Sequence, residues 1–211
     1  MDVVVIIPAY NEGGTVRQVV EAARSCPLVD EVVVVSDGST DRTVAEATAA
    51  GARVIALSEN QGKGAAMYAG LQATSQEVIL FLDGDLLGLT PRHVEKLLQP
   101  ILEERADMAV GIFDTGRVCT DLAQRIAPHL SGQRALRRSA LAGAPGFQEA
   151  GFGVETLITQ YAREMGWRVV TISLKHVSHR LKEEKQGFLK GLCTRFSMYR
   201  EILKVVFSRG H

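Results

Sequence analysis

"VILFLDGDLLGL", residues 78–89, is the stretch that most constrains the fold. Its first five residues are apolar and of strand length, which is typical of a strand covered on both faces. The acids Asp83 and Asp85 follow at once, and carboxylates are costly to bury unless a cation meets them. An Asx turn would explain the pair without a ligand. Side chains at i and i+2 of an extended backbone share one side, so the pair also suits a divalent cation such as Mg²⁺.

Similar apolar runs recur along the chain and alternate with segments of helical periodicity up to residue 112. Strands are expected over residues 3–7, 31–36, 53–57, 78–82, 108–112 and 168–172. Helices are expected over residues 14–25, 39–50, 64–74, 91–105 and 154–165, with Ser39 or Thr40 and Thr90 as N-caps. This alternation predicts an α/β fold with a mostly parallel sheet flanked by helices. Residues 113–150 give no strand prediction.

The composition is that of an ordinary soluble protein. With 211 residues, 46% of them hydrophobic, and a net charge of zero, we expect one domain over residues 1–211 and no nucleic-acid partner. Cys26, Cys119 and Cys193 are scattered and form neither a disulfide framework nor a metal motif. No stretch reaches the roughly 18 apolar residues of a membrane span. The apolar run at the start is too short for a signal peptide. These features predict a cytoplasmic protein.

Four polar loops follow the first four expected strands. Their sequences are PAYNE (8–12), SDGSTD (36–41), NQGKG (60–64) and DGD (83–85). Because ligands of open α/β sheets bind beyond the carboxyl ends of the strands, we expect one site at this rim. Each loop alone is weak evidence: DGSTD also suits a turn with an N-cap, and NQGKG lacks the spacing of a P-loop. The absence of G-x-G-x-x-G after the first strand argues against a dinucleotide fold.

In this order and spacing, the four motifs resemble family 2 glycosyltransferases of the GT-A fold. The resemblance is close over residues 3–112 and looser to about residue 185. It implies a single Rossmann-like domain with a mixed, mostly parallel sheet. Residues 1–112 would bind a nucleotide-sugar, residues 113–180 an acceptor, and residues 181–211 would form a basic lid and an amphipathic helix. The implied activity is metal-dependent transfer of a hexose from a nucleotide diphosphate sugar, with UDP-sugars favoured over GDP-sugars.

The resemblance also implies roles for individual residues. The donor would be bound by Pro8, Ala9, Tyr10, Glu12, Asp37, Gly62, Lys63, Asp83 and Gly84. Asp85 would be catalytic as a ligand of Mg²⁺ or Mn²⁺, with Asp83 near the ribose. Such a cation neutralises charge on the departing diphosphate.

The segment GFGVET (151–156) resembles the acceptor side of these enzymes and contains Glu155. Glu155 would be a general base for the acceptor hydroxyl, which implies inversion, or an acid favoured by the helix dipole. The segment is also similar to GYGVE of the glucosyl-3-phosphoglycerate synthases, which retain configuration and carry a later His-Arg pair. By that match His179 would be a further metal ligand, whereas a structural role is the alternative. His176 is expected to be structural.

The segment LSGQRAL (130–136) resembles the acceptor loop of polyprenyl-phosphate glycosyltransferases. Arg134, Arg137 and Arg138 would then meet an acceptor phosphate, unless they form a solvated basic face of a helix. The acceptor is therefore expected to be a small molecule or a lipid phosphate.

The C-terminal part of the chain is basic, with nine Lys or Arg and three Glu over residues 175–211. Its first part would be a lid from which Arg180, Lys182 or Lys185 reaches the diphosphate. The amphipathic helix over 188–206 would pack on the core or form a homodimer face. A peripheral contact with an anionic membrane is the alternative.

Two other functions stay open. A catalytically silent nucleotide-sugar-binding or scaffold protein would keep these loops without turnover. A sugar nucleotidyltransferase would need a glycine-rich N-terminal loop with Arg and Lys for a triphosphate, and PAYNEGGTVRQ lacks that basic signature.

Overall fold

The computed structural model describes residues 1–114, 131–141, 143 and 153–180. The strands are β1 (Val3–Ala9), β2 (Glu31–Asp37), β3 (Arg53–Leu57), β4 (Val78–Phe81), β5 (Leu86–Leu87), β6 (Met108–Asp114), β7 (Arg134–Arg137), β8 (Val169–Lys175) and β9 (Ser178–His179). The helices are α1 (Val16–Arg24), α2 (Thr43–Ala49), α3 (Lys63–Gln72), α4 (Pro91–Leu102), α6 (Arg138–Leu141) and α7 (Val154–Glu164).

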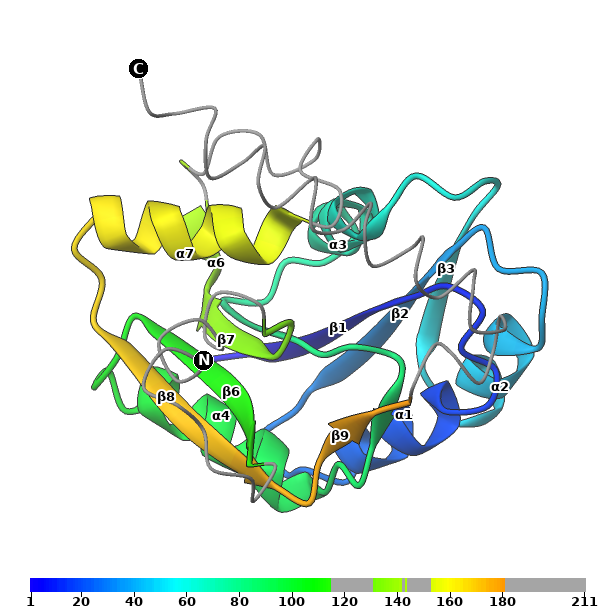
Figure 1. The fold of residues 1–211 in the computed structure, drawn as a ribbon, viewed down its shortest axis with the longest axis horizontal. Helices are drawn as coiled ribbons and strands as arrows, with labels where there is room; N and C mark the ends of the chain where they lie inside the picture. Colours follow the sequence, from blue (N-terminus) through cyan, green and yellow to red (C-terminus); the bar gives the residue numbers. More distant parts are fainter. Residues whose placement is uncertain (115–130, 142, 144–152, 181–211) are drawn as a thin grey trace.

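Seven strands form one sheet in the order β3-β2-β1-β4-β7-β6-β8, and β5 pairs with β9 in a separate small sheet. Within the large sheet, β7 runs antiparallel to β4 and β6, and the other neighbours are parallel. Helices cover both faces, with α1, α2 and α4 on one and α3 and α7 on the other (Figure 1). The predicted α/β fold with a mixed, mostly parallel sheet is confirmed.

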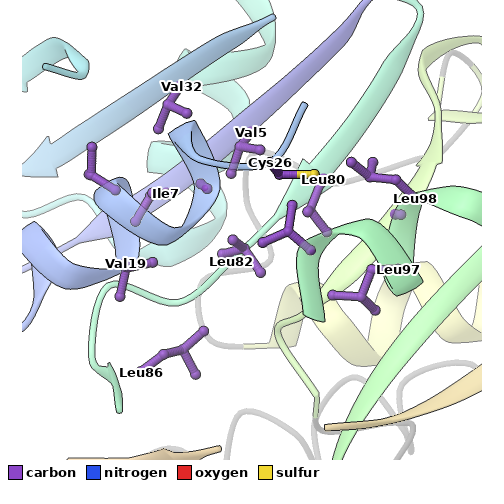
Figure 2. Close-up of a cluster of buried hydrophobic side chains, with 14 of the residues drawn as sticks. Val5, Ile7, Val19, Cys26, Val32, Leu80, Leu82, Leu86, Leu97 and Leu98 are labelled. Carbon is purple, nitrogen blue, oxygen red and sulfur yellow. The ribbon is translucent and has the colours of Figure 1, made fainter. Parts of the chain in front are cut away.

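The central strand β1 shows why its run of apolar residues is continuous. Successive side chains of a strand face opposite ways, so Val5 packs in the cluster with α1 and α4, while Ile6 packs in the cluster with α3 and α7. Figure 2 shows the first of these clusters, in which Leu80 and Leu82 lie near Leu97 of α4. Because both faces of β1 are buried, its polar neighbours in sequence lie beyond the end of the strand, in the loop after it.

The interpretation of residues 134–138 as a solvated helix face is wrong. Arg134 and Arg137 lie on strand β7, and Arg134 is fully buried. Arg138 begins α6, and its guanidinium donates to the carbonyls of Leu71 and Gln76, each at 2.8 Å, so it closes the end of α3. A strand with arginine at both ends has no apolar period, and for this reason the sequence does not predict it.

Helix α2 begins later than predicted, at Thr43 instead of Ser39. The N-cap is Arg42, and the carboxylate of Asp41 just before it accepts a hydrogen bond from the Thr43 amide at 2.9 Å. Ser39 and Thr40 join the loop after β2 to the loop after β1: the Asn11 amide donates to Ser39 Oγ, and the Asn11 side chain accepts from the Thr40 amide. The two loops therefore form one hydrogen-bonded unit. Thr90 precedes α4 as predicted.

In the part of the chain that the structure describes, no helix has both the length and the apolarity to cross a membrane. The predicted lid from residue 181 and the amphipathic helix, with its homodimer or membrane contact, lie outside the described residues, as do Cys119 and Cys193.

Candidate active site

The site lies where the strand order reverses. Strand β1 has β2 on one side and β4 on the other, and a crevice opens at the carboxyl ends of strands at such a switch point. Asp37 ends β2 and Asp83 follows β4 by two residues. The turn containing Asp83 is joined to the start of α1, because the buried Thr15 hydroxyl donates to the carbonyl of Gly84 at 2.9 Å. The loops that follow β1, β2 and β4, three of the four predicted loops, thus meet at one edge of the sheet.

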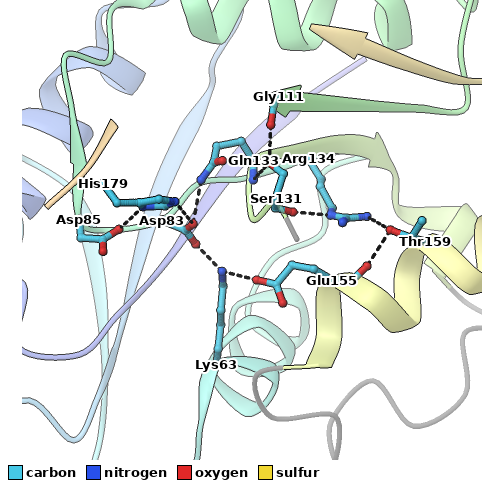
Figure 3. Close-up of polar contacts among 10 residues, drawn as sticks. All are labelled: Lys63, Asp83, Asp85, Gly111, Ser131, Gln133, Arg134, Glu155, Thr159 and His179. Atoms are coloured by element: carbon cyan, nitrogen blue, oxygen red, sulfur yellow. Dashed lines mark hydrogen bonds and ion pairs between the residues drawn. The ribbon is translucent and has the colours of Figure 1, made fainter. Parts of the chain in front are cut away.

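Asp83, Asp85 and His179 bring their side chains together at this edge (Figure 3). His179 Nδ1 lies 2.8 Å from Asp85 Oδ1, and His179 Nε2 lies 3.8 Å from Asp83 Oδ2. One possible ligand atom from each residue lies within 4.8 Å of the other two. Carboxylate oxygens and an imidazole nitrogen form a donor set that suits Mn²⁺ or Mg²⁺. The residues present therefore fit the predicted divalent cation.

His179 reaches the acids through the small sheet of β5 and β9. Leu86, next to Asp85, pairs with His179 in an antiparallel register, and the Arg180 amide donates to the Asp85 carbonyl at 3.0 Å. The His179 ring also contacts Phe113 edge-on, with centroids 4.7 Å apart. Backbone pairing therefore places a histidine from the far end of the described chain beside the acidic pair. His176 lies in the preceding turn and is exposed.

Lys63 forms the second part of the site. Its ammonium, at the start of α3, contacts the carboxylates of both Asp83 and Glu155. Burial opposes the charge on Lys63, but the two carboxylates outweigh it and raise the lysine pKa. Burial likewise acts to raise the pKa of Asp83, yet Lys63 and then His179 prevail and lower it to about 2. The pair is therefore ionised at neutral pH.

Asp37 holds the loop that leads to Lys63. Its two carboxylate oxygens accept hydrogen bonds from the Gln61 amide at 2.8 Å and the Gly62 amide at 2.9 Å. Gly38, directly after it, has φ +67°, and a Cβ there would lie 2.5 Å from the Asn60 amide nitrogen. A side chain at this position would therefore separate the two loops.

The other predicted donor residues lie around this cluster. Pro8 and Ala9 end β1, Tyr10 and Glu12 lie in the loop after it, and Gly62 and Gly84 lie in the loops before Lys63 and after Asp83. Tyr10 is 45% exposed, so its ring is open to a ligand, whereas Glu12 is buried. Figure 3 shows that the cluster itself contains Lys63, Asp83, Asp85, Glu155 and His179 among the predicted residues.

The sequence did not predict two residues of the network, Ser131 and Gln133. The side-chain Nε2 of Gln133 donates to Asp83 Oδ2 at 2.8 Å, and Ser131 Oγ lies within hydrogen-bonding distance of Gln133 Oε1. The LSGQRAL motif contains both residues, but their partner lies about fifty positions away and is reached only through β7.

Arg134 adds a second buried cation behind the acids. Its guanidinium donates to the Ser131 carbonyl at 2.8 Å and to the Thr159 hydroxyl at 2.7 Å. Burial lowers the pKa of Arg134 to about 10, although Glu155 and Asp83 act in the opposite direction. Arg134 is thus charged at neutral pH and is fully buried, which does not fit the predicted contact with an acceptor phosphate.

Comparison with known proteins finds one family model and relatives of known name. The family model for glycosyl transferase family 2 matches residues 4–156. The glucosyl-3-phosphoglycerate synthase of Mycolicibacterium smegmatis is 44% identical over 107 residues, which cover 46% of this chain and 35% of that protein. The synthase of Mycobacterium tuberculosis is 33% identical over 189 residues, which cover 72% of this chain and 57% of that protein. The chain therefore spans between about a third and somewhat over half of these relatives.

A solved structure matches a larger share of this chain than these two sequence relatives do. The crystal structure of the M. tuberculosis synthase with Mn²⁺, UDP and glucosyl-3-phosphoglycerate superposes with a TM-score of 0.80 at 29% identity. The match covers 99% of this chain and 79% of that one.

Proposed function

Because this chain belongs to glycosyl transferase family 2, we propose that it is a metal-dependent enzyme that transfers a hexose from a UDP-sugar to a small phosphorylated acceptor. The observation that carries the proposal is the meeting of Asp83, Asp85 and His179 at the carboxyl edge of the sheet, beside Lys63. A scaffold protein has no need for two acids and a histidine clustered next to an ammonium, and a buried carboxylate such as that of Asp85 is costly unless a cation meets it.

In this proposal Asp85 and His179 hold Mg²⁺ or Mn²⁺, and Asp83 lies near the ribose of the donor. The bound cation supplies Lewis-acid stabilisation of the charge on the departing diphosphate. Asp37 keeps the loop before Lys63 in place through the two amides that it accepts. Tyr10, which is exposed next to this loop system, offers a ring against which a base can stack.

The choice of substrates rests on the relatives. The structural relative is described in complex with UDP and a glucosylated phosphoglycerate, which supports a UDP-sugar donor and a small phosphorylated acceptor. A lipid-phosphate acceptor is the alternative raised by the LSGQRAL motif. Arg134, the buried arginine of that motif, donates to Ser131 and Thr159 inside the protein, which disfavours this alternative.

Glu155 is proposed to act on the acceptor side together with Lys63. The carboxylate of Glu155 is already engaged by the ammonium of Lys63. This contact favours a role for Glu155 in holding Lys63 over a role as general base, and it fits the retaining course implied by the resemblance of GFGVET.

The experiment that tests the proposed function is a turnover assay. The purified chain would be incubated with UDP-glucose and 3-phosphoglycerate, with Mn²⁺ or with a chelator, and both UDP and the glycosylated product would be measured. We expect product only with the metal and none from Asp85→Ala. Replacing the acceptor with a short polyprenyl phosphate tests the alternative. Turnover that persists in the chelator would contradict the proposal.

A further inference from the structure

Gln133 lies directly behind the acidic cluster and has no exposed surface. Its side-chain amide nitrogen lies 2.8 Å from Asp83 Oδ2, and its side-chain oxygen lies 3.0 Å from Ser131 Oγ. We propose that Gln133 is a positioning residue that orients the Asp83 carboxylate for the metal and the nucleotide, an inference that rests on the proposed function. No motif that the sequence offers assigns it this role.

The direction of this hydrogen bond follows from the charge on Asp83. An ionised carboxylate only accepts hydrogen bonds, so the amide nitrogen of Gln133 must face it and the amide oxygen must face Ser131. The other carboxylate oxygen, Oδ1, is occupied by the ammonium of Lys63. Asp83 therefore has a different fixed partner on each oxygen, and the pair of partners sets the plane of the carboxylate. Oδ2, the oxygen that Gln133 holds, is also the one near His179.

Gln133 is itself held by the sheet. The backbone carbonyl of Gln133 accepts a hydrogen bond from the backbone amide of Gly111 in β6 at 2.8 Å, and the hydroxyl of Ser131 contacts the Gly111 carbonyl. The chain then enters β7, which pairs with β4 just before Asp83. The amide donor is thus fixed by two neighbouring strands, and this rigidity is what an orienting residue requires.

The neighbouring Gly132 leaves no space for rearrangement. A Cβ on Gly132 would fall against the Asp83 carboxylate and 2.6 Å from Lys63 Nζ. The backbone at this point therefore packs directly on the ion pair. Gln133 is fully buried, so its donor reaches Asp83 from the interior of the protein.

The test compares two glutamine-to-leucine substitutions. Gln133→Leu keeps the approximate volume and removes the donor to Asp83. Gln76→Leu is the matched control, because the Gln76 amide donates to the Glu31 carboxylate at 2.7 Å, outside the active-site network. The dissociation constant of UDP in the presence of Mn²⁺ would be measured by calorimetry for both variants and the wild type. The unfolding temperature without ligand would be measured in parallel.

We expect Gln133→Leu to raise this dissociation constant roughly 10–100-fold, the usual effect of removing a hydrogen-bond partner that orients a side chain at a metal site. Gln76→Leu should leave it unchanged. A Gln133→Leu variant that is folded and binds UDP with Mn²⁺ as tightly as the wild type would overturn the inference. Wild-type protein that binds no UDP with Mn²⁺ would instead overturn the proposed function on which the inference rests.

A second variant covers the case in which Gln133→Leu does not fold. Ser131→Ala leaves Gln133 in place but removes the hydroxyl that fixes its oxygen. We expect the dissociation constant of UDP with Mn²⁺ to rise roughly fivefold, the equivalent of one ordinary hydrogen bond. An unchanged constant in folded Ser131→Ala would overturn the inference.

Discussion

The ammonium of Lys63 lies between the carboxylates of Asp83 and Glu155, and one partly buried cation thereby joins an acid of the proposed metal site to the acid proposed for the acceptor side. Asp83 follows β4, Glu155 lies in the first turn of α7, and Lys63 begins α3. Helix α3 and strand β4 follow one another in the chain, whereas α7 lies about seventy residues later. Loss of Lys63 should therefore disturb both halves of the site at once.

Lys63→Met should leave the buried Glu155 and the partly buried Asp83 without the cation between them. Removing one partner of a buried ion pair typically costs about 3–5 kcal/mol of unfolding free energy. Chemical denaturation would measure the loss, and Lys96→Met, at an exposed position on α4, is the control with little expected effect. Adding Glu155→Gln to Lys63→Met should recover part of the stability. If Lys63→Met alone is as stable as the wild type, the ion pair contributes nothing to the free energy of unfolding.

His179→Ala should weaken metal-dependent binding of UDP about 10–100-fold, because it removes one of the three clustered side chains that could hold the cation. The control is His176→Asn, which changes an exposed histidine three residues earlier at a position with φ +62° that asparagine tolerates. A titration of Mn²⁺ at fixed UDP would compare the two. If both variants require the same Mn²⁺ concentration, His179 has only a structural role.

Glu155→Gln distinguishes the two roles considered for this acid. If Glu155 mainly holds Lys63, the amide oxygen still accepts from the ammonium, and kcat should fall by about tenfold or less. If Glu155 is the general base, kcat should fall about 10²–10⁴-fold while donor affinity stays unchanged. Steady-state kinetics with separate kcat and KM values would settle which loss occurs. The larger loss, together with an inverted product, would contradict the role proposed above.

Metal binding should strengthen as the pH rises. Burial tends to lower the pKa of His179, but its hydrogen bond with Asp85 and the charges of Asp83 and Asp85 outweigh burial and raise it. A cation needs the neutral imidazole, so below this raised pKa it must displace a proton. We expect the affinity for Mn²⁺ with UDP to increase between about pH 5.5 and about pH 8, and His179→Ala to flatten the profile. An affinity that falls over this range would contradict the assignment.

The sequence predicted the parts of the site that follow parallel strands. β1, β2 and β4 are buried on both faces, so their apolar runs are continuous, and Asp37 and Asp83 could be placed at their ends from the sequence alone. Lys63 was assigned to the nucleotide site through the resemblance of the NQGKG loop. The roles given to Tyr10, Glu12 and Glu155 stay predictions.

The parts that were missed depend on pairing between distant residues. Strand β7 reads Arg-Ala-Leu-Arg, in which neither period nor composition indicates a strand, and its place is fixed by β4 and β6. Gln133 precedes this strand, so its contact with Asp83 was equally hidden. His179 came from a motif resemblance, because strands of two residues such as β5 and β9 have no detectable pattern.

The central claim is that Asp83, Asp85 and His179 form a metal-dependent nucleotide site, and a thermal-shift experiment tests it most directly. Wild type and Asp85→Ala would be unfolded with UDP, with Mn²⁺, and with both together. At about 100 times its dissociation constant, the ligand should raise the wild-type unfolding temperature by roughly 5–10 °C only when UDP and Mn²⁺ are both present. Asp85→Ala should show no such rise. An equal rise in the variant, or a wild-type rise with UDP alone, would contradict the claim.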